Sequence, residues 1–342
     1  MPLRIGLTFD LKPANAERSP SSENNFGIND YFAEHDSEET VSLIENALKS
    51  RGHKVIRIGS AKELLKKLRA LNCDIVFNIA EGVNGRNRES EVPAILETLR
   101  IPYVGSDALT LSLSLDKAIS KKIFAYHDIP TPPYFECVNK KDIIVPKGFS
   151  FPFIVKPRYE GSAKGIEPDS RVDNLMDLKK KTKYIIRTYK QPALVEEFIS
   201  GWEFTVGIIG NDKPEVLPVV QRHVESRTNL SSHIFEKAGL DKDKLRYKEF
   251  LEIEPELESQ IKGYALTAFC GLDCRDFARL DFRVSEQDLS RKRQKMYLLE
   301  INPLPSLAKD DYFAMTSELL GISYNEMINK ILDAAVKRYK CR

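Results

Sequence analysis

The chain has 342 residues, of which 42% are hydrophobic and 30% charged, a balance that excludes disordered and collagen-like proteins. Its 52 lysines and arginines nearly balance its 50 acidic residues, which argues against nucleic acid or a lipid surface as a partner. Five scattered cysteines and the lack of any run of about 18 apolar residues exclude a disulfide framework and a membrane span. We therefore expect a cytoplasmic protein of two or three domains.

Strands alternate with helices in the first third of the chain. The expected strands cover residues 3–9, 54–58 and 74–79, and helices begin at Asp36 and at a Ser60–Glu63 capping box. This alternation predicts parallel βαβ units. The polar segment 12–35 has no periodicity, and its length favours a loop that closes over a binding site.

The rest of the chain has an α+β pattern, with strands that could pair antiparallel. A helix over 116–127 is followed by three prolines, which mark a change of unit. The expected strands lie at 153–156, 193–198, 203–209, 215–220, 277–284 and 296–301, and the expected helices at 175–189, 257–269, near 317–320 and at 324–339. Residues 221–247 are irregular and polar, and the lysines at 121–122 and 179–181 are expected on solvated helix faces.

A glycine-rich loop follows a strand that ends in a lysine. The strand ends at Lys156, and Glu160-Gly161-Ser162-Ala163-Lys164-Gly165 comes next. The glycines permit close approach of backbone N–H groups to an anion, and Lys156 would add a point charge for phosphate. There is no G-x-x-x-x-G-K-[ST] motif, and no G-x-G-x-x-G follows the first strand. An ordinary hairpin turn with an edge lysine is the alternative.

Two glutamates lie in or next to apolar strands. Glu196 and Glu203 would be costly to bury without a partner. They are therefore candidates for hydrogen bonds to sugar hydroxyls or to an exocyclic amine. Solvated positions on an edge strand are equally compatible with the pattern.

Three oxygen ligands lie on two apolar strands near the end of the chain. Glu300 and Asn302 are two residues apart and share a face, and Asp281 joins them if the strands pair. Such hard ligands suit Mg²⁺ held together with phosphates. Arg279 lies on the same face and could stabilise developing negative charge. A buried ion pair between Arg279 and Glu300 is the alternative.

Seven short motifs follow one another along essentially the whole chain. They are Leu115-Asp116-Lys117, Val155-Lys156-Pro157, Glu160-Gly161-Ser162, Val195-Glu196-Glu197-Phe198, Glu203-Phe204-Thr205-Val206, Arg279-Leu280-Asp281 and Glu300-Ile301-Asn302-Pro303. In this order they resemble the ATP-grasp superfamily and, within it, the D-alanine–D-alanine ligases. The resemblance implies an α/β ATP-grasp fold with an N-terminal parallel-sheet (pre-ATP-grasp) domain at 1–115. A two-part α+β ATP-binding body would follow, with a central subdomain at 116–197 and a C-terminal subdomain with the metal site at 198–342.

The same resemblance implies how ATP and metal would be held. Phosphates would be bound by Lys117 and Lys156, and the loop with Glu160 and Ser162 would close over them. Adenine and ribose would be held by Glu196, Glu197, Phe198, Ile199 and Glu203. Asp281, Glu300 and Asn302 would bind two Mg²⁺ ions, which Mn²⁺ could replace.

The implied activity is that of an ATP-dependent ligase forming an amide bond between amino-acid-like substrates, in a homodimer. A substrate carboxylate would attack ATP to form an acyl phosphate, which an amine then attacks. Arg279 and backbone groups near Ser306 would stabilise the oxyanion, and Glu38 would meet the ammonium of the first amino acid. Ser162 belongs to the loop that closes on the site, and Lys237 to a second closing loop at 221–247.

Three departures separate the chain from the pattern of the ligases. Glu81 stands where the ligases carry a histidine, and Arg86, Arg88 and Glu89 follow it; Ala163 replaces one of two serines. Asp311 and its neighbour Asp310 fall where the ligases bind the acceptor carboxylate. We therefore expect a substrate pair other than two D-alanines. A genuine D-alanine–D-alanine ligase, an ATP-binding protein without ligase activity and an ATP-grasp kinase are the alternatives.

Overall fold

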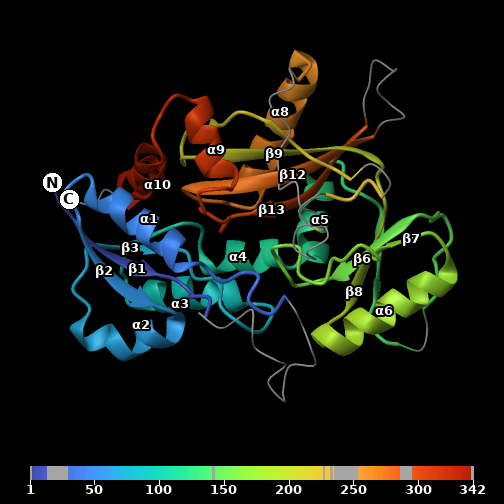
Figure 1. The fold of residues 1–342 in the computed structure, drawn as a ribbon, viewed down its shortest axis with the longest axis horizontal. Coiled ribbons are helices and arrows are strands. Elements are labelled where there is room, and N and C mark those ends of the chain that lie inside the picture. Colours follow the sequence, from blue (N-terminus) through green and yellow to red (C-terminus); the bar gives the residue numbers. More distant parts are fainter. Residues whose placement is uncertain are drawn as a thin grey trace.

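A computed structural model describes residues 2–13, 30–140, 143–225, 228–231, 234, 253–285 and 295–339. Three sheets form its framework, each within one of the three expected units, and they surround a common centre (Figure 1). The described strands are β1 (Arg4–Thr8), β2 (Lys54–Gly59), β3 (Ile75–Asn78), β4 (Tyr103–Val104), β5 (Tyr134–Cys137), β6 (Phe153–Pro157), β7 (Arg171–Val172), β8 (Ala193–Glu197), β9 (Gly201–Ile209), β10 (Glu215–Val216), β11 (Val220–Arg222), β12 (Phe277–Ser285) and β13 (Met296–Asn302). The α-helices are α1 (Glu38–Lys49), α2 (Ala61–Lys67), α3 (Glu91–Thr98), α4 (Ala108–Leu115), α5 (Lys117–Tyr126), α6 (Leu175–Tyr189), α8 (Pro255–Gly271), α9 (Tyr312–Leu319) and α10 (Tyr324–Tyr339).

The N-terminal sheet is parallel, in the order β2-β1-β3-β4, as the βαβ pattern predicts. Its helix starts differ in detail from the sequence prediction. Ser37, not Asp36, caps α1, because the Ser37 hydroxyl accepts a hydrogen bond from the backbone N–H of Thr40 at 3.0 Å. Ser60 precedes α2 as expected but makes no side-chain capping bond.

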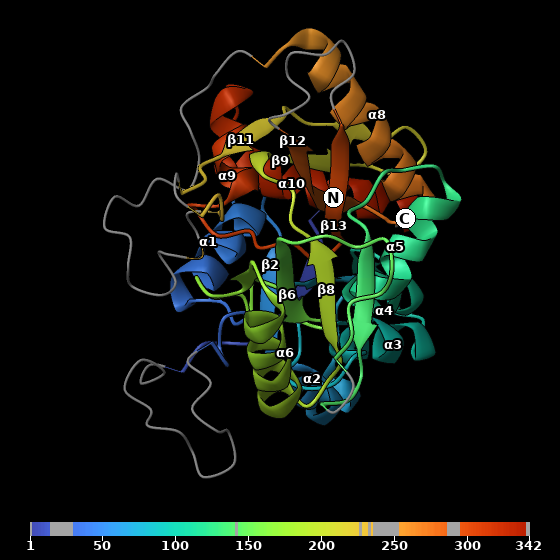
Figure 2. The same cartoon turned by 90° about the vertical axis from the view of Figure 1, so that its right-hand side faces the viewer.

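The central sheet is antiparallel, in the order β5-β8-β6-β7, and α6 packs against it. Figure 2 shows α6 in front of β6 and β8. Strand β6 lies between β8 and β7 and ends at Pro157, so Lys156 is at its carboxyl end and the glycine-rich loop follows directly. The expected helix 175–189 matches α6 in both bounds.

The C-terminal sheet has the order β10-β9-β12-β13, with β11 also paired to β9. A single strand over 215–220 was expected, but that prediction is wrong. The chain pairs at Glu215–Val216 and again at Val220–Arg222, because Pro218 lies between and has no backbone N–H to donate. The helix expected near 317–320 begins earlier, at Tyr312, where the Asp311 side chain caps it.

Alternation along β12 divides this sheet into two faces. Ala278, Leu280 and Phe282 are buried in one hydrophobic cluster with α8, whereas the residues between them are polar. In Figure 1, α8 lies above the sheet, and α4 and α5 lie below it. The face with the alternating polar residues is therefore the one turned towards the centre of the molecule.

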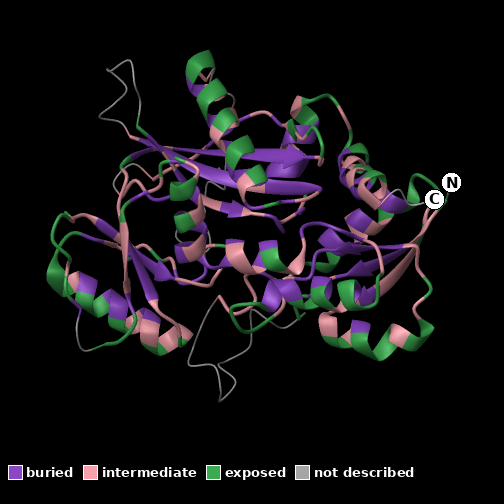
Figure 3. Ribbon diagram, turned by 180° about the vertical axis from the view of Figure 1, so that it is seen from behind, coloured by how far each residue is buried: buried purple, intermediate pink, exposed green. Residues whose placement is uncertain are grey.

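The last two helices join the C-terminal sheet to the N-terminal one. One hydrophobic cluster combines Ile5 and Ile44 from the N-terminal part with Phe277, Phe313 and Ile331 from the C-terminal part. Figure 3 shows the strands almost continuously buried and the helices exposed on their outer faces. No helix in the described part of the chain is both long and apolar enough to span a membrane.

Candidate active site

A cavity of about 820 Å³ lies between the three sheets, a volume typical of small-molecule sites. Nearly all the residues singled out from the sequence line it. They are Glu81, Lys117, Lys156, Glu160, Ser162, Glu196, Glu197, Phe198, Ile199, Glu203, Arg279, Asp281, Glu300, Asn302, Ser306 and Asp311. Residues far apart in the sequence therefore meet in one place. Lys237 and most of the expected 221–247 loop lie outside the described residues.

Glu38 is the described site residue that the structure does not bring to this cavity. It occupies the first turn of α1, and its carboxylate accepts hydrogen bonds from Arg57 at 2.5 Å and Ser42 at 3.1 Å at the surface. The hydrogen bond from Arg57 lowers the pKa of Glu38. Because this glutamate already has a cationic partner outside the cavity, the expected contact with a substrate ammonium is not supported by this geometry.

The expected oxygen ligands face one another across two paired strands. Asp281 is the partner of Glu300, and Arg279 is the partner of Asn302, in the antiparallel register of β12 and β13. The Glu300 carboxylate lies 3.3 Å from Lys117 Nζ and accepts a hydrogen bond from Asn302 at 3.4 Å. Burial alone would raise the pKa of Glu300, but Lys117, Lys156 and Arg279 outweigh it and bring the value to about 2. Glu300 is therefore ionised at neutral pH.

This donor set fits a hard divalent cation that also has phosphate ligands. Asp281 Oδ1 is buried and accepts no hydrogen bond from the described residues, which leaves an anionic oxygen for another ligand. No group of three or more His, Cys, Asp or Glu side chains in the described ranges forms a metal cage. A cation here would thus combine Asp281, Glu300 and the amide oxygen of Asn302 with oxygens of a bound nucleotide, as Mg²⁺ commonly does.

Arg279 is oriented by two acidic residues. Its Nη2 donates to Asp281 Oδ2 at 3.2 Å, and its Nη1 lies 3.8 Å from Asp311 Oδ1. An ion pair with Glu300 was the alternative, and it is not formed, because Glu300 pairs with Lys117 instead. The guanidinium therefore lies at the wall of the cavity beside the oxygen ligands.

Lys156 belongs to a buried group of two lysines and one glutamate. Glu196 Oε2 lies 2.9 Å from Lys156 Nζ, and Glu196 Oε1 lies 3.0 Å from Lys121 Nζ. The prediction that Lys121 lies on a solvated face is wrong, since this residue is only 1% exposed. Lys121 follows Lys117 by one helical turn, so helical spacing alone could have indicated a shared face. Lys181 of the second lysine run is likewise buried, paired with Glu167 and Asp169.

An apolar compartment lies beside this charged group. Ile154, Ile166, Phe198 and Leu230 pack together and line the cavity. At its edge, Glu203 accepts two hydrogen bonds from Arg283, at 2.9 and 3.1 Å. A flat aromatic base could bind between these apolar side chains, with polar groups available at its rim. Glu197 accepts a hydrogen bond from the Ser150 backbone at 3.1 Å, and the Ile199 carbonyl accepts one from Arg283 at 3.4 Å.

The glycine-rich loop has left-handed backbone conformations at two non-glycine positions as well as at a glycine. Ser162 and Ala163 have φ of 46° and 54°, and Gly165 has φ of 74°. A Cβ atom at Gly165 would lie 2.4 Å from Pro157 Cγ, so this position requires glycine. Lys117 Nζ donates to the Glu160 carbonyl at 2.5 Å, which joins the loop to the start of α5.

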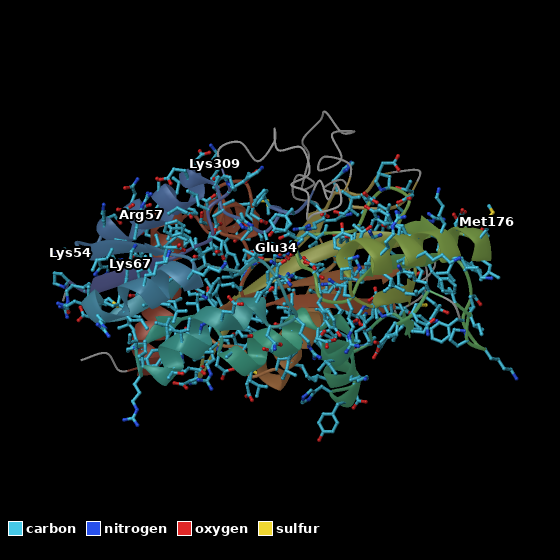
Figure 4. All side chains as sticks on the ribbon, turned by 90° about the horizontal axis from the view of Figure 1, so that it is seen from below. Glu34, Lys54, Arg57, Lys67, Met176 and Lys309 are labelled. Carbon is cyan, nitrogen blue, oxygen red and sulfur yellow. The ribbon has the colours of Figure 1, made fainter. Side chains whose placement is uncertain are left out.

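Two acidic residues of the N-terminal part hold the same loop, and sequence reasoning missed them. Glu34 accepts from the Gly161 N–H at 2.7 Å, and Asp30 accepts from the Gly165 N–H at 2.7 Å. Glu34 also pairs with Arg88 at 2.6 Å and with Lys164 at 3.2 Å. Figure 4 shows Glu34 in the interior, whereas Lys54, Arg57 and Lys309 lie at the periphery. The end of the expected 12–35 loop thus contacts the loop that faces the cavity.

Asp36 belongs to the acidic region near Glu81 and gives the fold a pH dependence. Burial, reinforced by Asp10, raises the pKa of Asp36 to about 8. The folded protein therefore binds this proton more tightly than the unfolded chain, whose aspartates titrate near 4, and the free energy of unfolding falls as the pH rises from about 4 to about 8. We expect a lower melting temperature at about pH 9 than at about pH 6, and a smaller difference for Asp36→Asn. If Asp36→Asn showed the same difference in melting temperature between these two pH values as the wild type, Asp36 would not be the source of the pH dependence.

The remaining predicted residues lie at the opposite wall. Ser306 Oγ accepts a hydrogen bond from the Ala308 backbone at 3.3 Å, and Asp311 accepts from the Tyr312 N–H at 2.7 Å as the cap of α9. Asp311 therefore keeps one oxygen engaged in its helix and lies within reach of Arg279. Both residues line the cavity from the C-terminal part.

Comparison with known proteins agrees with this arrangement. The model of the D-ala D-ala ligase C-terminus family matches residues 123–333, more than half of the chain. A D-alanine–D-alanine ligase of Carboxydothermus hydrogenoformans is 31% identical, over 86% of this chain and 94% of its own length. The uncharacterized protein y4sG of Sinorhizobium fredii is 33% identical, over 86% of each chain.

Two solved structures share the fold. The D-alanine–D-alanine ligase of Bacillus anthracis complexed with ATP has a TM-score of 0.74 at 22% identity, covering 99% of both chains. The VanG D-Ala:D-Ser ligase of Enterococcus faecalis has a TM-score of 0.72 at 18% identity, covering 98% of this chain and 100% of its own. The chain therefore belongs to the D-alanine–D-alanine ligase family of ATP-grasp proteins, which are ATP-dependent ligases that form carbon–nitrogen bonds.

Proposed function

We propose that the protein uses ATP to join the carboxylate of one amino-acid-like substrate to the amine of another, on a pair other than two D-alanines. One observation carries the proposal. The same cavity holds cations and oxygen ligands suited to a nucleotide, such as Lys117, Lys156 and Asp281, and the carboxylates of Glu81 and Asp311. The resemblance to the ligases implies neutral or cationic groups at these two positions.

The nucleotide half of the cavity has a complete set of groups for ATP. Adenine would lie in the apolar compartment around Phe198, and the phosphates would lie near Lys156, Lys117 and the N–H groups of the glycine-rich loop. Asp281, Glu300 and Asn302 would hold Mg²⁺, which would neutralise phosphate charge when bound.

The chemistry proceeds in two steps. A carboxylate oxygen of the first substrate attacks the γ-phosphorus of ATP, and ADP leaves, which gives an acyl phosphate. The amine nitrogen of the second substrate then attacks the carbonyl carbon and loses a proton, and inorganic phosphate departs as the amide forms. Arg279, with backbone N–H groups near Ser306, would stabilise the oxyanion of the tetrahedral intermediate. Closure of the cavity would keep water from hydrolysing the acyl phosphate.

The acidic groups argue against two D-alanines as the pair. A second substrate that presents its carboxylate to Asp311 would meet a like charge there. The glutamate at position 81 cannot act as the neutral or cationic donor that histidine provides, unless it is protonated. Both features favour substrates with ammonium or hydroxyl groups at these positions.

The direct test is a screen of amino-acid pairs. Purified protein is incubated with ATP, Mg²⁺ and pairs of amino acids, and phosphate release and product mass are recorded. We expect release that depends on both substrates and an amide product, with D-alanine a poor substrate. Efficient formation of D-alanyl-D-alanine would contradict the altered pair, a stable phosphorylated product without an amine would indicate a kinase, and ATP binding without turnover would indicate a binding protein.

Removal of divalent cations should stop the reaction. We expect EDTA to abolish phosphate release and added Mg²⁺ or Mn²⁺ to restore it, because the carboxylates of Asp281 and Glu300 cannot neutralise phosphate by themselves. Asp281→Asn should require a higher Mg²⁺ concentration for half-maximal rate, while its circular dichroism spectrum matches the wild type. A rate that is unaffected by both changes would overturn the metal assignment.

The proposal includes the division into units at 1–115, 116–197 and 198–342 and a homodimer formed through the first unit. Sedimentation velocity tests the assembly, since a dimer of this chain would have twice its mass of 39.0 kDa.

A further inference from the structure

Two carboxylates of the N-terminal part that line the cavity form no ion pair with the described residues. Glu81 follows β3, and Glu89 lies in the 3₁₀ turn Arg88–Ser90; both line the cavity. Within the described part of the chain, neither side chain accepts a hydrogen bond or lies within 4.0 Å of a cationic nitrogen. Glu89 is only 8% exposed, so it is a buried carboxyl group at the wall of the cavity.

The cations that act on this pair are Arg88, on both carboxylates, and Lys117, on Glu89. Both already have other partners, and that of Lys117 is Glu300 at 3.3 Å. Arg88 pairs with Glu34 at 2.6 Å and lies 3.5 Å from Glu160. Lys164 pairs with Glu160 at 2.7 Å and with Glu34 at 3.2 Å. Two cations and two carboxylates thus balance each other in this network. Glu81 and Glu89 remain as two carboxyl groups outside that balance.

An uncompensated pair of this kind is costly in an empty cavity. Burial raises the pKa of Glu89 to about 7 against the opposing effect of Arg88, and burial together with Glu34, Glu89 and Asp36 raises the pKa of Glu81. Natural proteins seldom keep buried carboxylates without a partner unless a ligand supplies one. A bound cation would restore both groups to their ionised form.

Apolar side chains from the N-terminal part of the chain line the same cavity. They include Phe32, Ala33 and Leu115. A methylene stem can lie along such side chains while its charged end reaches a carboxylate. The cavity therefore offers two carboxylates and apolar lining residues, which suit an alkyl chain with a positive charge at its end.

We propose that this end of the cavity binds an amino-acid substrate with two positive charges, an α-ammonium and a side-chain ammonium or guanidinium, between Glu81 and Glu89. The inference rests on the proposed function, whose substrate class it names. One surplus carboxylate would suffice for the α-ammonium that every amino acid has. The second one selects a basic side chain.

The test compares amino acids that differ in the side-chain charge alone. Arginine is paired with citrulline, and lysine with norleucine, each in the L and D forms. Binding is measured by calorimetry on the full-length protein with ADP and Mg²⁺, and KM is measured by phosphate release where turnover occurs. We expect the basic member of a pair to bind at least about tenfold more tightly, which corresponds to about 1.4 kcal/mol.

Charge-neutral variants assign the effect to the two glutamates. Glu81→Gln and Glu89→Gln should each reduce the preference for arginine over citrulline by about tenfold, mainly by weakening arginine binding. Glu318→Gln changes an exposed glutamate at the end of α9 and should leave the preference unchanged. Equal affinity within each pair, an unchanged preference in both variants, or preference for an acidic side chain would each overturn the inference.

The outcomes separate this inference from the proposed function. Turnover with neutral pairs but no preference for basic ones would leave the ligase activity and remove the cationic subsite. Selective binding of arginine or lysine in calorimetry, without phosphate release for any pair, would support the subsite and reject the ligase activity.

Discussion

Arg279→Ala is expected to lower the rate of amide formation by about 10²–10³-fold, the usual effect of removing one donor to a developing oxyanion. Arg279 lies on β12 next to the oxygen ligands, and Asp281 and Asp311 hold its guanidinium at the cavity wall. The variant should keep its fold, because the side chain faces the cavity and not the cluster under α8. Single-turnover phosphate release and product formation measure the effect.

Arg279→Lys is the matched comparison. It keeps the charge but loses the planar fork that two carboxylates orient, so we expect an intermediate rate. ATP binding should change little in either variant if Arg279 acts on the reacting carbonyl. A wild-type rate in Arg279→Ala would remove this residue from the mechanism, and a loss confined to ATP affinity would reassign it to the nucleotide.

Glu196→Ala is expected to lower the free energy of unfolding by about 3–5 kcal/mol, the usual cost of breaking a buried ion pair. Glu196 is 1% exposed and lies between Lys121 and Lys156. Burial lowers the pKa of Lys121 to about 8, although the negative charge of Glu196 opposes this shift. Without that carboxylate, two buried lysines would face each other unpaired.

Urea denaturation followed by circular dichroism measures the loss of unfolding free energy in Glu196→Ala. Glu318→Ala, at an exposed position, should change stability by no more than about 0.5 kcal/mol. Glu196 raises the pKa of Lys121, so its removal should bring that pKa below the wild-type value of about 8. Raising the pH towards about 8 should therefore narrow the stability gap between Glu196→Ala and the wild type, because Lys121 loses its proton at a lower pH in the variant. A cost below about 1 kcal/mol would mean that Glu196 is not the counter-ion of the lysines.

Much of the fold follows from local pattern. Ala278, Leu280 and Phe282 alternate with Arg279, Asp281 and Arg283. This alternation predicts a strand with one apolar and one polar face, and the structure has that strand.

In segment Ala108–Leu115 the local pattern indicates the wrong element. Its leucines alternate at every second position, which indicates a strand, yet it forms α4. Asp107 caps the helix by accepting from Thr110 N–H, and the Thr110 hydroxyl donates to the Leu272 carbonyl at 3.0 Å, a contact that no local pattern contains.

The cavity lining was largely predictable from the sequence, but its electrostatic pairing was not. Glu300 and Asn302 share a face because they are two apart, and this follows from the strand period alone. Glu34 lies 127 residues from Gly161 in the sequence, and nothing in either segment indicates their hydrogen bond. Glu38 was assigned a substrate contact by resemblance, whereas Arg57, on the neighbouring strand β2, holds it at the surface.

The distribution of hydrophobic clusters has a mechanical consequence. The N-terminal and C-terminal sheets share one cluster, and Asn329 of α10 donates to the Ala47 carbonyl of α1 at 2.7 Å, so these two sheets form one body. The buried residues of the central sheet's cluster, from Cys137 to Val195, all belong to that part of the chain. When a nucleotide enters, the central sheet is therefore expected to swing as a unit relative to the body formed by the N-terminal and C-terminal sheets. Such a swing would have to break the bonds from Gly161 and Gly165 to Glu34 and Asp30, so those bonds contribute to the resistance to opening.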